Sequence, residues 1–409
     1  MKSKNKKILC ITPSYYPAIQ FGGPIQALRS LMENLNSLDC DVKIITTNKG
    51  GKEIKSKSKR FIDNIEITYH NSSKLFDIFN ETGWHFSLSL LRQIIKEGPK
   101  QDIFYCRAIW NFPTLAAYIV ARVLNKPLIV AATGKLYPII LNKMSFKKRI
   151  YWNLFVKRIL KYSFIHFTSE KEKKSCLSSY IIEDKSIIIK TSTNISSKAN
   201  DVIKNFSLKK IKSNGKKILF LGRLHPIKGL EILIKTYNKI FCTLPNTTLI
   251  LSGPDEGEYK KKLIKLINDL EMNYADIPLS EISKNNIDGK IVFTGMINED
   301  EKIWLLSQID VYCHLSISEG FSNSIIEAMS MKKPVVISDG CNFDEVSEKN
   351  LGLIGKQIDE HTSNILTLFK DEDLSNSLGQ NGFDYIEANF SGLNIARDAS
   401  NKISEIIRE

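Results

Sequence analysis

Two short segments carry most of the side chains that could do chemistry. The first contains Gly222, Arg223, Lys228 and Gly229 between an apolar run and an expected helix. Glycine permits a tight turn, and the free N–H groups of a helix start favour anions. Arginine can grip a diphosphate with two parallel hydrogen bonds, and lysine adds a point charge. The segment therefore indicates a phosphate-binding turn, the alternative being a surface loop with two basic residues.

The second segment follows an expected buried strand at 311–314 and has two carboxylates eight positions apart, Glu319 and Glu327. We expect Glu327 in the opening turn of the next helix, with Ser322 or Asn323 as its N-cap. The loop carboxylate would then meet sugar hydroxyls, while the helical carboxylate accepts hydrogen bonds from a ribose diol. In the alternative, Glu327 stabilises the helix start and Glu319 is a solvated loop residue.

Apolar runs that alternate with helical segments must position these residues. The expected strands are 8–11, 42–46, 103–105, 128–131 and 165–168, and then 218–221, 248–251, 291–294, 311–314 and 334–338. Such alternation predicts parallel sheets covered on both faces. We predict an α/β protein with two doubly wound, Rossmann-like domains facing a cleft, with ligands beyond the carboxyl ends of the strands.

A polar, lysine-rich stretch divides the two series of strands. We therefore expect an N-terminal domain over residues 1–200, a linker over 201–215 and a C-terminal domain over 216–390. The last helix, 391–409, is expected to pack back on the N-terminal domain.

The composition suits a globular protein with anionic partners. The chain has 409 residues, 43% of them hydrophobic, and a net charge of +14. Coding bias toward lysine is an alternative source of that charge. The seven cysteines form no C-x2-C pair, which indicates a reducing compartment. No apolar run approaches the ~18 residues that a membrane span needs, and we expect a cytoplasmic protein.

Residues 103–169 contain no Asp or Glu, and within them 146–162 forms an amphipathic pattern. Its apolar side has Trp152, Phe155, Val156, Ile159 and Leu160, and its basic side has Lys147, Lys157, Arg158 and Lys161. We expect the apolar side to pack on the first sheet. The basic side would contact anionic lipid at the inner face of the plasma membrane.

Together the two motifs resemble the retaining, nucleotide-sugar-dependent glycosyltransferases called family four, the group 1 glycosyl transferases of GT-B fold. The likeness is close over roughly 216–390, including 251–257, 293–296, 334–338 and 340–343. It is looser in the first half, through Gly22-Gly23, 110–113 and 133–136. This chain lacks the histidine that many members carry near Arg107 or Thr133.

The resemblance implies a transferase that moves a sugar from a nucleotide diphosphate sugar to a glycan acceptor, lipid-linked, in cell-surface polysaccharide synthesis such as lipopolysaccharide or capsule. Arg223 and Lys228 would hold the diphosphate, Glu319 the transferred sugar and Glu327 the ribose. The further donor-binding positions are Gly22, Gly23, Gly222, Gly320, Phe321, Ser322 and Asn323. Glu319, Arg223 and Lys228 would be the catalytic group.

We expect no metal cofactor. Asp371-Glu372-Asp373 has the form of a metal-binding D-x-D pair, but no apolar strand precedes it, and we interpret it as an acidic helix start. Two other functions remain open: a non-catalytic protein that binds sugar nucleotide or glycan, and a sugar-nucleotide epimerase. Nucleic acid is not an expected partner, because no zinc site, helix-turn-helix or aromatic-basic RNA motif is present.

Overall fold

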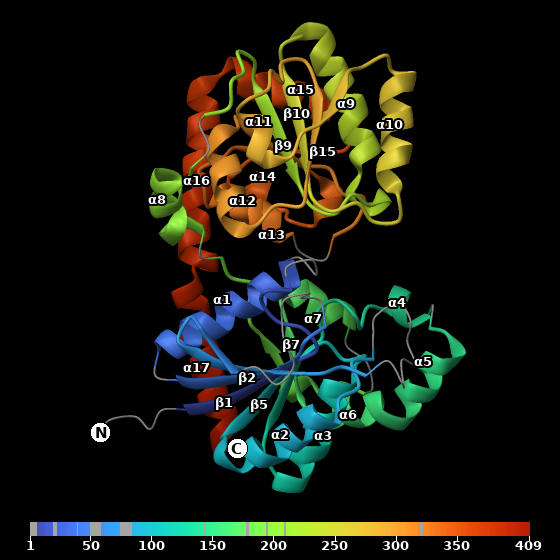
Figure 1. The fold of residues 1–409 in the computed structure, drawn as a ribbon, viewed down its shortest axis with the longest axis vertical. Helices are drawn as coiled ribbons and strands as arrows, with labels where there is room; N and C mark the ends of the chain where they lie inside the picture. Colours follow the sequence, from blue (N-terminus) through green and yellow to red (C-terminus); the bar gives the residue numbers. More distant parts are fainter. Residues whose placement is uncertain are drawn as a thin grey trace. The chain divides into compact units, whose positions relative to one another are not determined.

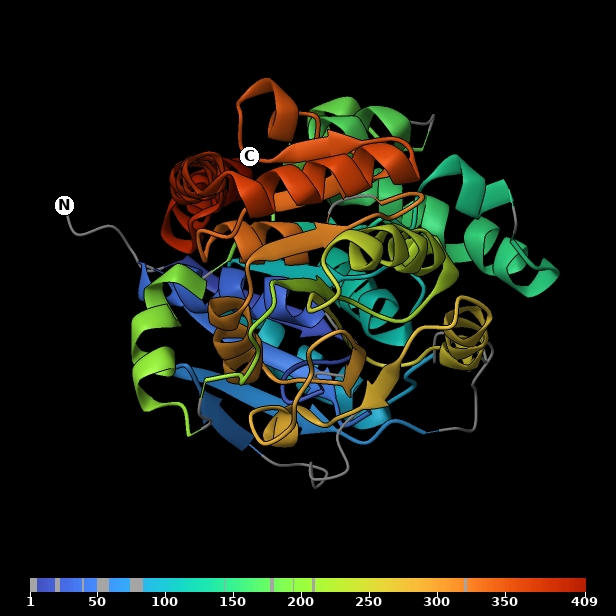
Figure 2. The same ribbon diagram turned by 90° about the horizontal axis from the view of Figure 1, so that it is seen from above.

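The computed structural model divides the chain into two compact units, residues 1–192 with 392–409, and residues 193–391 (Figure 1). It describes residues 6–18, 23–38, 40–49, 59–73, 84–142, 144–176, 180–193, 195–207, 210–319 and 322–409. Each unit has one parallel-rich sheet with helices on both faces (Figures 1 and 2). The expected α/β fold class is confirmed.

The first unit contains an eight-stranded sheet of order β3-β4-β2-β1-β5-β6-β7-β8, in which only β3 runs antiparallel to its neighbour. Its strands are β1 (Lys6–Thr12), β2 (Cys40–Thr47), β3 (Lys59–Ile62), β4 (Ile65–His70), β5 (Ile103–Arg107), β6 (Leu128–Ala131), β7 (Phe164–Phe167) and β8 (Ser186–Ile188). The run Ile8-Leu9-Cys10-Ile11 of β1 is fully buried, because helices cover both faces of the sheet.

Alternate residues of the strands face two separate cores. One core contains residues of α1 (Gly23–Ser37) and α17 (Gly392–Arg408), which pack against each other. The other contains residues of α2 (Leu88–Glu97), α3 (Phe112–Leu124), α5 (Phe146–Tyr151), a π-helical turn at Trp152–Val156 and α6 (Lys157–Tyr162). No helix among the described residues is long and apolar enough to cross a membrane.

The second unit contains a seven-stranded parallel sheet of order β11-β12-β10-β9-β13-β14-β15. Its strands are β9 (Lys217–Leu221), β10 (Thr248–Ser252), β11 (Tyr274–Asp276), β12 (Ile291–Gly295), β13 (Val311–His314), β14 (Val335–Ser338) and β15 (Leu353–Gly355). One face packs on α9 (Leu230–Thr243), α10 (Tyr259–Asp269) and α15 (Ile358–Lys370). The other packs on α11 (Leu279–Ile282), α12 (Glu299–Gln308), α13 (Asn323–Met329) and α16 (Glu372–Phe390).

The linker expected over 201–215 is a wrong prediction in its first part. Residues Ile195–Asn205 form helix α8, which belongs to the second unit. Ile195 and Ala199 are buried against Ile303 of α12. The stretch looked like a linker because it is polar, but its few apolar side chains share one helical face. The division of the chain therefore falls between residues 192 and 193.

Strand order creates a switch point between β9 and β13 in the second sheet. The chain passes from β9 to β10 on one side, whereas β13 pairs with β9 on the other, with Tyr312 opposite Leu219. In such sheets ligands bind where connections diverge beyond the carboxyl ends of the strands. The loops after β9 and β13 also touch, because the Ile317 N–H donates to the Ile227 carbonyl at 2.8 Å.

We predict that Gly229 is required for this contact between the two loops. Gly229 has a φ of +65°, and a Cβ there would lie 1.9 Å from the Leu315 carbonyl oxygen. Gly257 has a φ of +67° with no heavy atom of the described chain within 4 Å of its would-be Cβ. Gly257→Ala should lower the free energy of unfolding by about 1 kcal/mol through backbone strain alone. Gly229→Ala should cost roughly 3 kcal/mol, because overpacking adds to the strain.

Urea unfolding of the two variants beside the parent protein measures the difference. Equal losses in the two variants would show that the close approach to Leu315 is not maintained in solution.

Candidate functional site

The loop after β9 is built to present Lys228. A short 3-10 helix, η5 (Pro226–Lys228), begins after His225, whose Nδ1 accepts the Ile227 N–H at 3.2 Å. Gly229 then adopts the left-handed conformation and leads into α9. Lys228 is thus fixed at the end of a tight turn beside β13.

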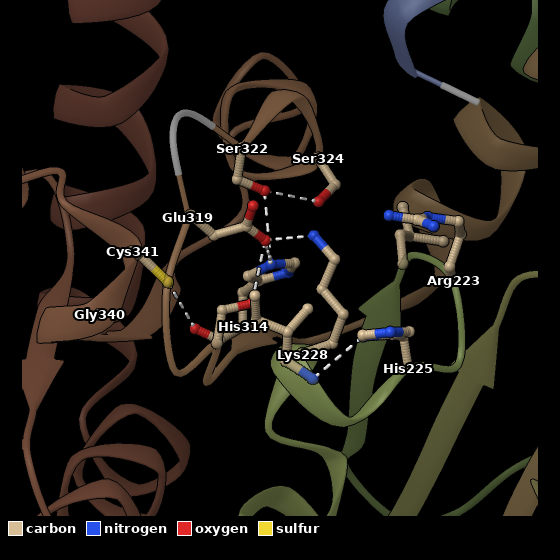
Figure 3. A network of polar contacts seen from close by, with 12 residues as sticks. Arg223, His225, Lys228, His314, Glu319, Ser322, Ser324, Gly340 and Cys341 are labelled. Carbon is tan, nitrogen blue, oxygen red and sulfur yellow. Dashed lines mark hydrogen bonds and ion pairs between the residues drawn. The ribbon is translucent and has the colours of Figure 1, made fainter. Parts of the chain in front are cut away.

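Lys228 and Glu319 meet beyond the carboxyl ends of β9 and β13, although 91 positions separate them in the sequence (Figure 3). The Lys228 Nζ forms an ion pair with Glu319 Oε1, and their side chains are only 15% and 12% exposed. Two of the predicted site residues are therefore brought together. The interpretation of Glu319 as a solvated loop residue is excluded by its burial.

The Glu319 carboxylate has further partners from its own loop and strand. His314 Nε2 and Ser316 Oγ each lie 3.0 Å from Oε1. Burial by itself would raise the pKa of Glu319, but the hydrogen bond from His314 and the charge of Lys228 lower that pKa to about 2. Glu319 is therefore an ionised carboxylate in a largely buried position.

Backbone contacts hold the Glu319 loop against the next strand connection. The Glu319 N–H donates to the Gly340 carbonyl at 2.9 Å, and Asn342 Nδ2 donates to the Glu319 carbonyl at 2.7 Å. A Cβ at Gly340 would lie 2.3 Å from the Ser316 carbonyl oxygen. Glycine at this position therefore lets η6 (Asp339–Cys341) approach the loop closely.

Arg223 does not join this network. Its guanidinium forms an ion pair with Glu256, and both side chains are about half exposed. Figure 3 shows Arg223 apart from Lys228 and Glu319. Arg223 lies in the loop after β9 and Glu256 in the loop after β10, so this ion pair links the connections of β9 and its other neighbour, β10.

Glu327 differs from its prediction in two respects. Helix α13 begins at Asn323, so Glu327 is in the second turn and not in the opening turn. Its carboxylate is also not free of protein partners, because Lys302 Nζ of α12 lies 2.6 Å from Oε1. The two side chains are 16% and 12% exposed. Lys302 was missed in the sequence, where its only signal was a position in the opening turns of the helix after a buried strand.

The remaining predicted donor-binding positions are placed as follows. Ser322 occupies the N-cap of α13, yet its hydroxyl lies 3.1 Å from Ser324 Oγ and 3.4 Å from His314 Nε2 and makes no capping bond. Gly222 follows β9, and its N–H donates to the Ser252 carbonyl at 3.0 Å. Gly23 begins α1 of the first unit. Gly22, Gly320 and Phe321 lie outside the described residues.

His314, the last residue of β13, is a second residue that the sequence interpretation missed. Its side chain is fully buried and its ring stacks on Phe220, with ring centroids 5.3 Å apart. The Tyr312 hydroxyl lies 3.0 Å from Nδ1. Burial lowers the pKa of His314, and the hydrogen bond to Glu319 offsets part of that effect. Its signal was a histidine that ends an otherwise apolar strand five positions before Glu319.

The Asp371-Glu372-Asp373 segment is a helix start, as interpreted from the sequence. Asp371 is the N-cap of α16 and accepts the Leu374 N–H at 2.8 Å. Within the described ranges, no group of three or more His, Cys, Asp and Glu side chains could hold a metal ion.

Comparisons with known proteins give the class of this protein. A family model described as glycosyl transferases group 1 matches residues 201–385. An uncharacterized glycosyltransferase of Methanocaldococcus jannaschii is 27% identical over 330 residues, covering 77% of this chain and 76% of the relative. In Campylobacter jejuni, N-acetylgalactosamine-N,N'-diacetylbacillosaminyl-diphospho-undecaprenol 4-alpha-N-acetylgalactosaminyltransferase is 26% identical over 197 residues, 47% of this chain and 48% of that enzyme.

Among solved structures, Anabaena HepE in complex with UDP and glucose superposes with a TM-score of 0.68 at 17% identity. The superposition covers 98% of this chain and 100% of HepE. The fold is therefore that of a GT-B glycosyltransferase. The match to the group 1 family model lies within the second unit, and relatives that match about three quarters of this chain bear the name glycosyltransferase.

We predict that Glu319 makes stability depend on pH in the acid range. Its pKa falls from 4.5 to about 2 on folding, so its contribution is fully present above pH 4.5 and is lost as pH falls toward 2. Glu319→Gln should remove up to about 3 kcal/mol of this pH-dependent stability. Urea unfolding between pH 7 and pH 3 measures it.

Glu256→Gln is the matched control, because the pair that it breaks is about half exposed. Solvent screening should keep its effect under about 1 kcal/mol at every pH. If the two variants had the same pH profile, the buried ion pair of Glu319 would not be present in solution.

Proposed function

We propose that this glycosyltransferase takes a sugar from a nucleotide diphosphate sugar bound beyond β9 and β13 and transfers it with retention of anomeric configuration. The observation that carries the proposal is the meeting of Lys228 and Glu319 at the switch point of the second sheet. The complex of HepE with UDP and glucose supports a donor of this chemical class.

The proposed roles follow from charge. Lys228 and Arg223 bind the diphosphate, and their positive charge stabilises the negative charge that gathers on this leaving group in the transition state. Both cations have carboxylate partners in the protein, Glu319 and Glu256. A diphosphate carries more than one negative charge, so it can compete for both.

The carboxylates and the helix start would hold the rest of the donor. Glu319 binds hydroxyl groups of the transferred sugar, and Glu327 binds the ribose through the oxygen that Lys302 does not occupy. Ser322 and Asn323 lie at the start of α13, where backbone N–H groups add hydrogen bonds to the diphosphate.

We predict that nucleoside diphosphates stabilise the protein in a thermal-shift screen of UDP, GDP, ADP and their sugars. One diphosphate should raise the melting temperature, because a ligand at 100 times its Kd adds about 2.7 kcal/mol. Lys228→Met should weaken that binding roughly 10- to 100-fold through the loss of a charge-assisted bond.

Lys239→Met is the control, because Lys239 on α9 also pairs with a carboxylate, Asp359, but both side chains are exposed. Its diphosphate affinity should equal that of the parent protein. The proposal is contradicted if no nucleoside diphosphate binds, or if Lys228→Met binds as tightly as the control.

We also propose that transfer needs no metal cofactor, since Lys228 and Arg223 supply the positive charge at the diphosphate. EDTA should leave diphosphate binding and sugar transfer unchanged. Loss of transfer in EDTA with recovery in Mn²⁺ would contradict this proposal.

The acceptor that we propose is a lipid-linked glycan in cell-surface polysaccharide assembly, reached from the cytoplasmic face of a membrane. The name of the Campylobacter relative includes a diphospho-undecaprenol.

The helical segment 146–162 consists of α5, the π-helical turn and α6. Four of its predicted apolar residues are buried, Trp152, Val156, Ile159 and Leu160, and Phe155 is partly buried. This part of the sequence pattern is confirmed.

The exposed side of the same helical segment, 146–162, has a feature that the sequence interpretation did not use. Phe146, Ile150 and Leu154 are 78%, 45% and 50% exposed at a spacing of four residues, which places them on one stripe. Basic residues flank the stripe at Lys147, Arg149, Arg158 and Lys161. An apolar stripe among cations suits the interface of an anionic bilayer.

We predict that the protein sediments with phosphatidylglycerol vesicles at low salt and much less with phosphatidylcholine vesicles. Phe146→Ser should weaken vesicle binding by roughly tenfold or more, because the phenyl group loses its burial in lipid. Phe61→Ser, on edge strand β3, removes a ring that is 70% exposed and is the control. Failure to bind anionic vesicles at low salt, where attraction is strongest, would overturn the membrane proposal.

A further inference from the structure

All side-chain bonds to the Glu319 carboxylate among the described residues end on one oxygen. Lys228 Nζ, His314 Nε2 and Ser316 Oγ converge on Oε1 (Figure 3). Three donors therefore hold Oε1 in place. Because the carboxylate is a rigid group, holding Oε1 also limits the direction in which Oε2 points. Oε2 keeps its capacity to accept hydrogen bonds from a ligand.

The three donors are not equivalent when a diphosphate binds. Lys228 is the cation expected at the phosphates. When a nucleotide sugar binds, its diphosphate therefore competes with Glu319 for the charge of Lys228. A largely buried carboxylate that loses its counter-ion and hydrogen bonds tends to take up a proton. His314 and Ser316 are neutral hydrogen-bond donors, so a diphosphate attracts them less strongly than it attracts Lys228.

The tautomer of His314 is fixed by its neighbours. Because an ionised carboxylate can only accept, His314 Nε2 must carry the hydrogen that faces Oε1. Nδ1 is then the acceptor and lies 3.0 Å from the Tyr312 hydroxyl, nearer than the Leu221 carbonyl, which is 3.4 Å from the same hydroxyl. A chain of hydrogen bonds therefore runs from Tyr312 through His314 to Glu319, inside a fully buried strand end.

We propose that His314 is a positioning residue for sugar recognition: oriented by Tyr312, it holds the Glu319 carboxylate ionised and aimed at the transferred sugar while Lys228 binds the diphosphate. This inference rests on the proposed function, because it assumes a nucleotide sugar beyond β9 and β13. It adds a role for two residues that neither of the sequence motifs contains.

The titratable groups around Glu319 come from three elements. Lys228 faces it from η5 and His314 from β13, and the Cys341 thiol of η6 is also close enough to interact with its charge. Burial raises the pKa of Tyr312, and the nearby Glu327 charge raises it further. Among the groups that lower the pKa of Glu319, the hydrogen bond from His314 is foremost.

The test compares the affinity for a nucleotide sugar with that for its nucleoside diphosphate, because Glu319 acts on the sugar alone. Calorimetric titrations would use UDP with UDP-glucose, GDP with GDP-mannose and ADP with ADP-glucose, continuing with the pair that binds. His314→Leu should leave the nucleoside diphosphate affinity within about threefold of the parent and reduce the extra affinity due to the sugar about 10- to 100-fold.

The pH dependence separates positioning from simple packing. Without the His314 donor the pKa of Glu319 rises, so the sugar-dependent affinity of His314→Leu should fall relative to that of the parent protein as pH drops from 7 to 4.5. The parent protein is the reference at each pH, because the terminal phosphate of the nucleoside diphosphate itself takes up a proton at about pH 6. His314→Gln can donate to Glu319 and accept from Tyr312, and it should restore most of the sugar-dependent affinity. Tyr312→Phe should give an intermediate loss.

His361→Gln is the matched control, since His361 is a buried histidine of the same unit on α15. It should change stability without changing the sugar-dependent affinity. If His314→Leu does not fold, the comparison of His314→Gln, Tyr312→Phe and His361→Gln decides the question. The inference is overturned if Tyr312→Phe and the folded His314 variants keep the parent's sugar-dependent affinity and pH profile, or if His314→Gln is no better than His314→Leu.

Failure of the proposed function gives a different result. In that case the parent protein binds none of the nucleoside diphosphates or their sugars. Binding by the parent with unaffected His314 variants overturns the inference alone.

Discussion

The direct pairing of β9 with β13 is the constraint on which the site depends. These strands are far apart in the sequence, yet they are neighbours in the sheet, and their connections leave at the same edge. Lys228 and Glu319 meet only because of this pairing. The close approach of Gly229 to the Leu315 carbonyl then sets how near the two loops can come.

The ion pairs of the second unit differ in how far they are buried. Lys228 with Glu319, and Lys302 with Glu327, are two cation–carboxylate pairs with little exposed surface. A buried charge without a partner is costly, so each pair holds its two side chains in place. Arg223 with Glu256 is about half exposed, and this pair can exchange partners at little cost. The site thus combines two fixed carboxylates with one more adaptable cation.

The sequence predicted the long central strands and the turn after β9, because apolar runs and glycine-bearing turns are local signals, whereas the short strands β3, β8, β11 and β15 and the alternating strand β4 were not among the expected ones. Expected strands such as 311–314 and 128–131 coincide with β13 and β6. Lys302 and His314 could not be assigned, because their roles depend on which helix crosses the sheet and on what surrounds a strand end. The prediction of a linker over 201–215 was wrong in its first part because α8 has only a few apolar residues, and these are buried only by packing on α12. The basic side of 146–162 contained Phe146, Ile150 and Leu154 all along, but only the structure shows that they remain exposed.

A double-mutant cycle on nucleotide-sugar binding tests the central claim most directly. Calorimetry on the parent, Lys228→Met, Glu319→Gln and the double variant gives the coupling free energy of the two side chains in the bound state. If both act on one ligand beyond β9 and β13, each single variant weakens binding and the coupling differs from zero by about 1 kcal/mol or more. Unchanged binding in both single variants would show that the sugar nucleotide is bound elsewhere, and the account would be wrong.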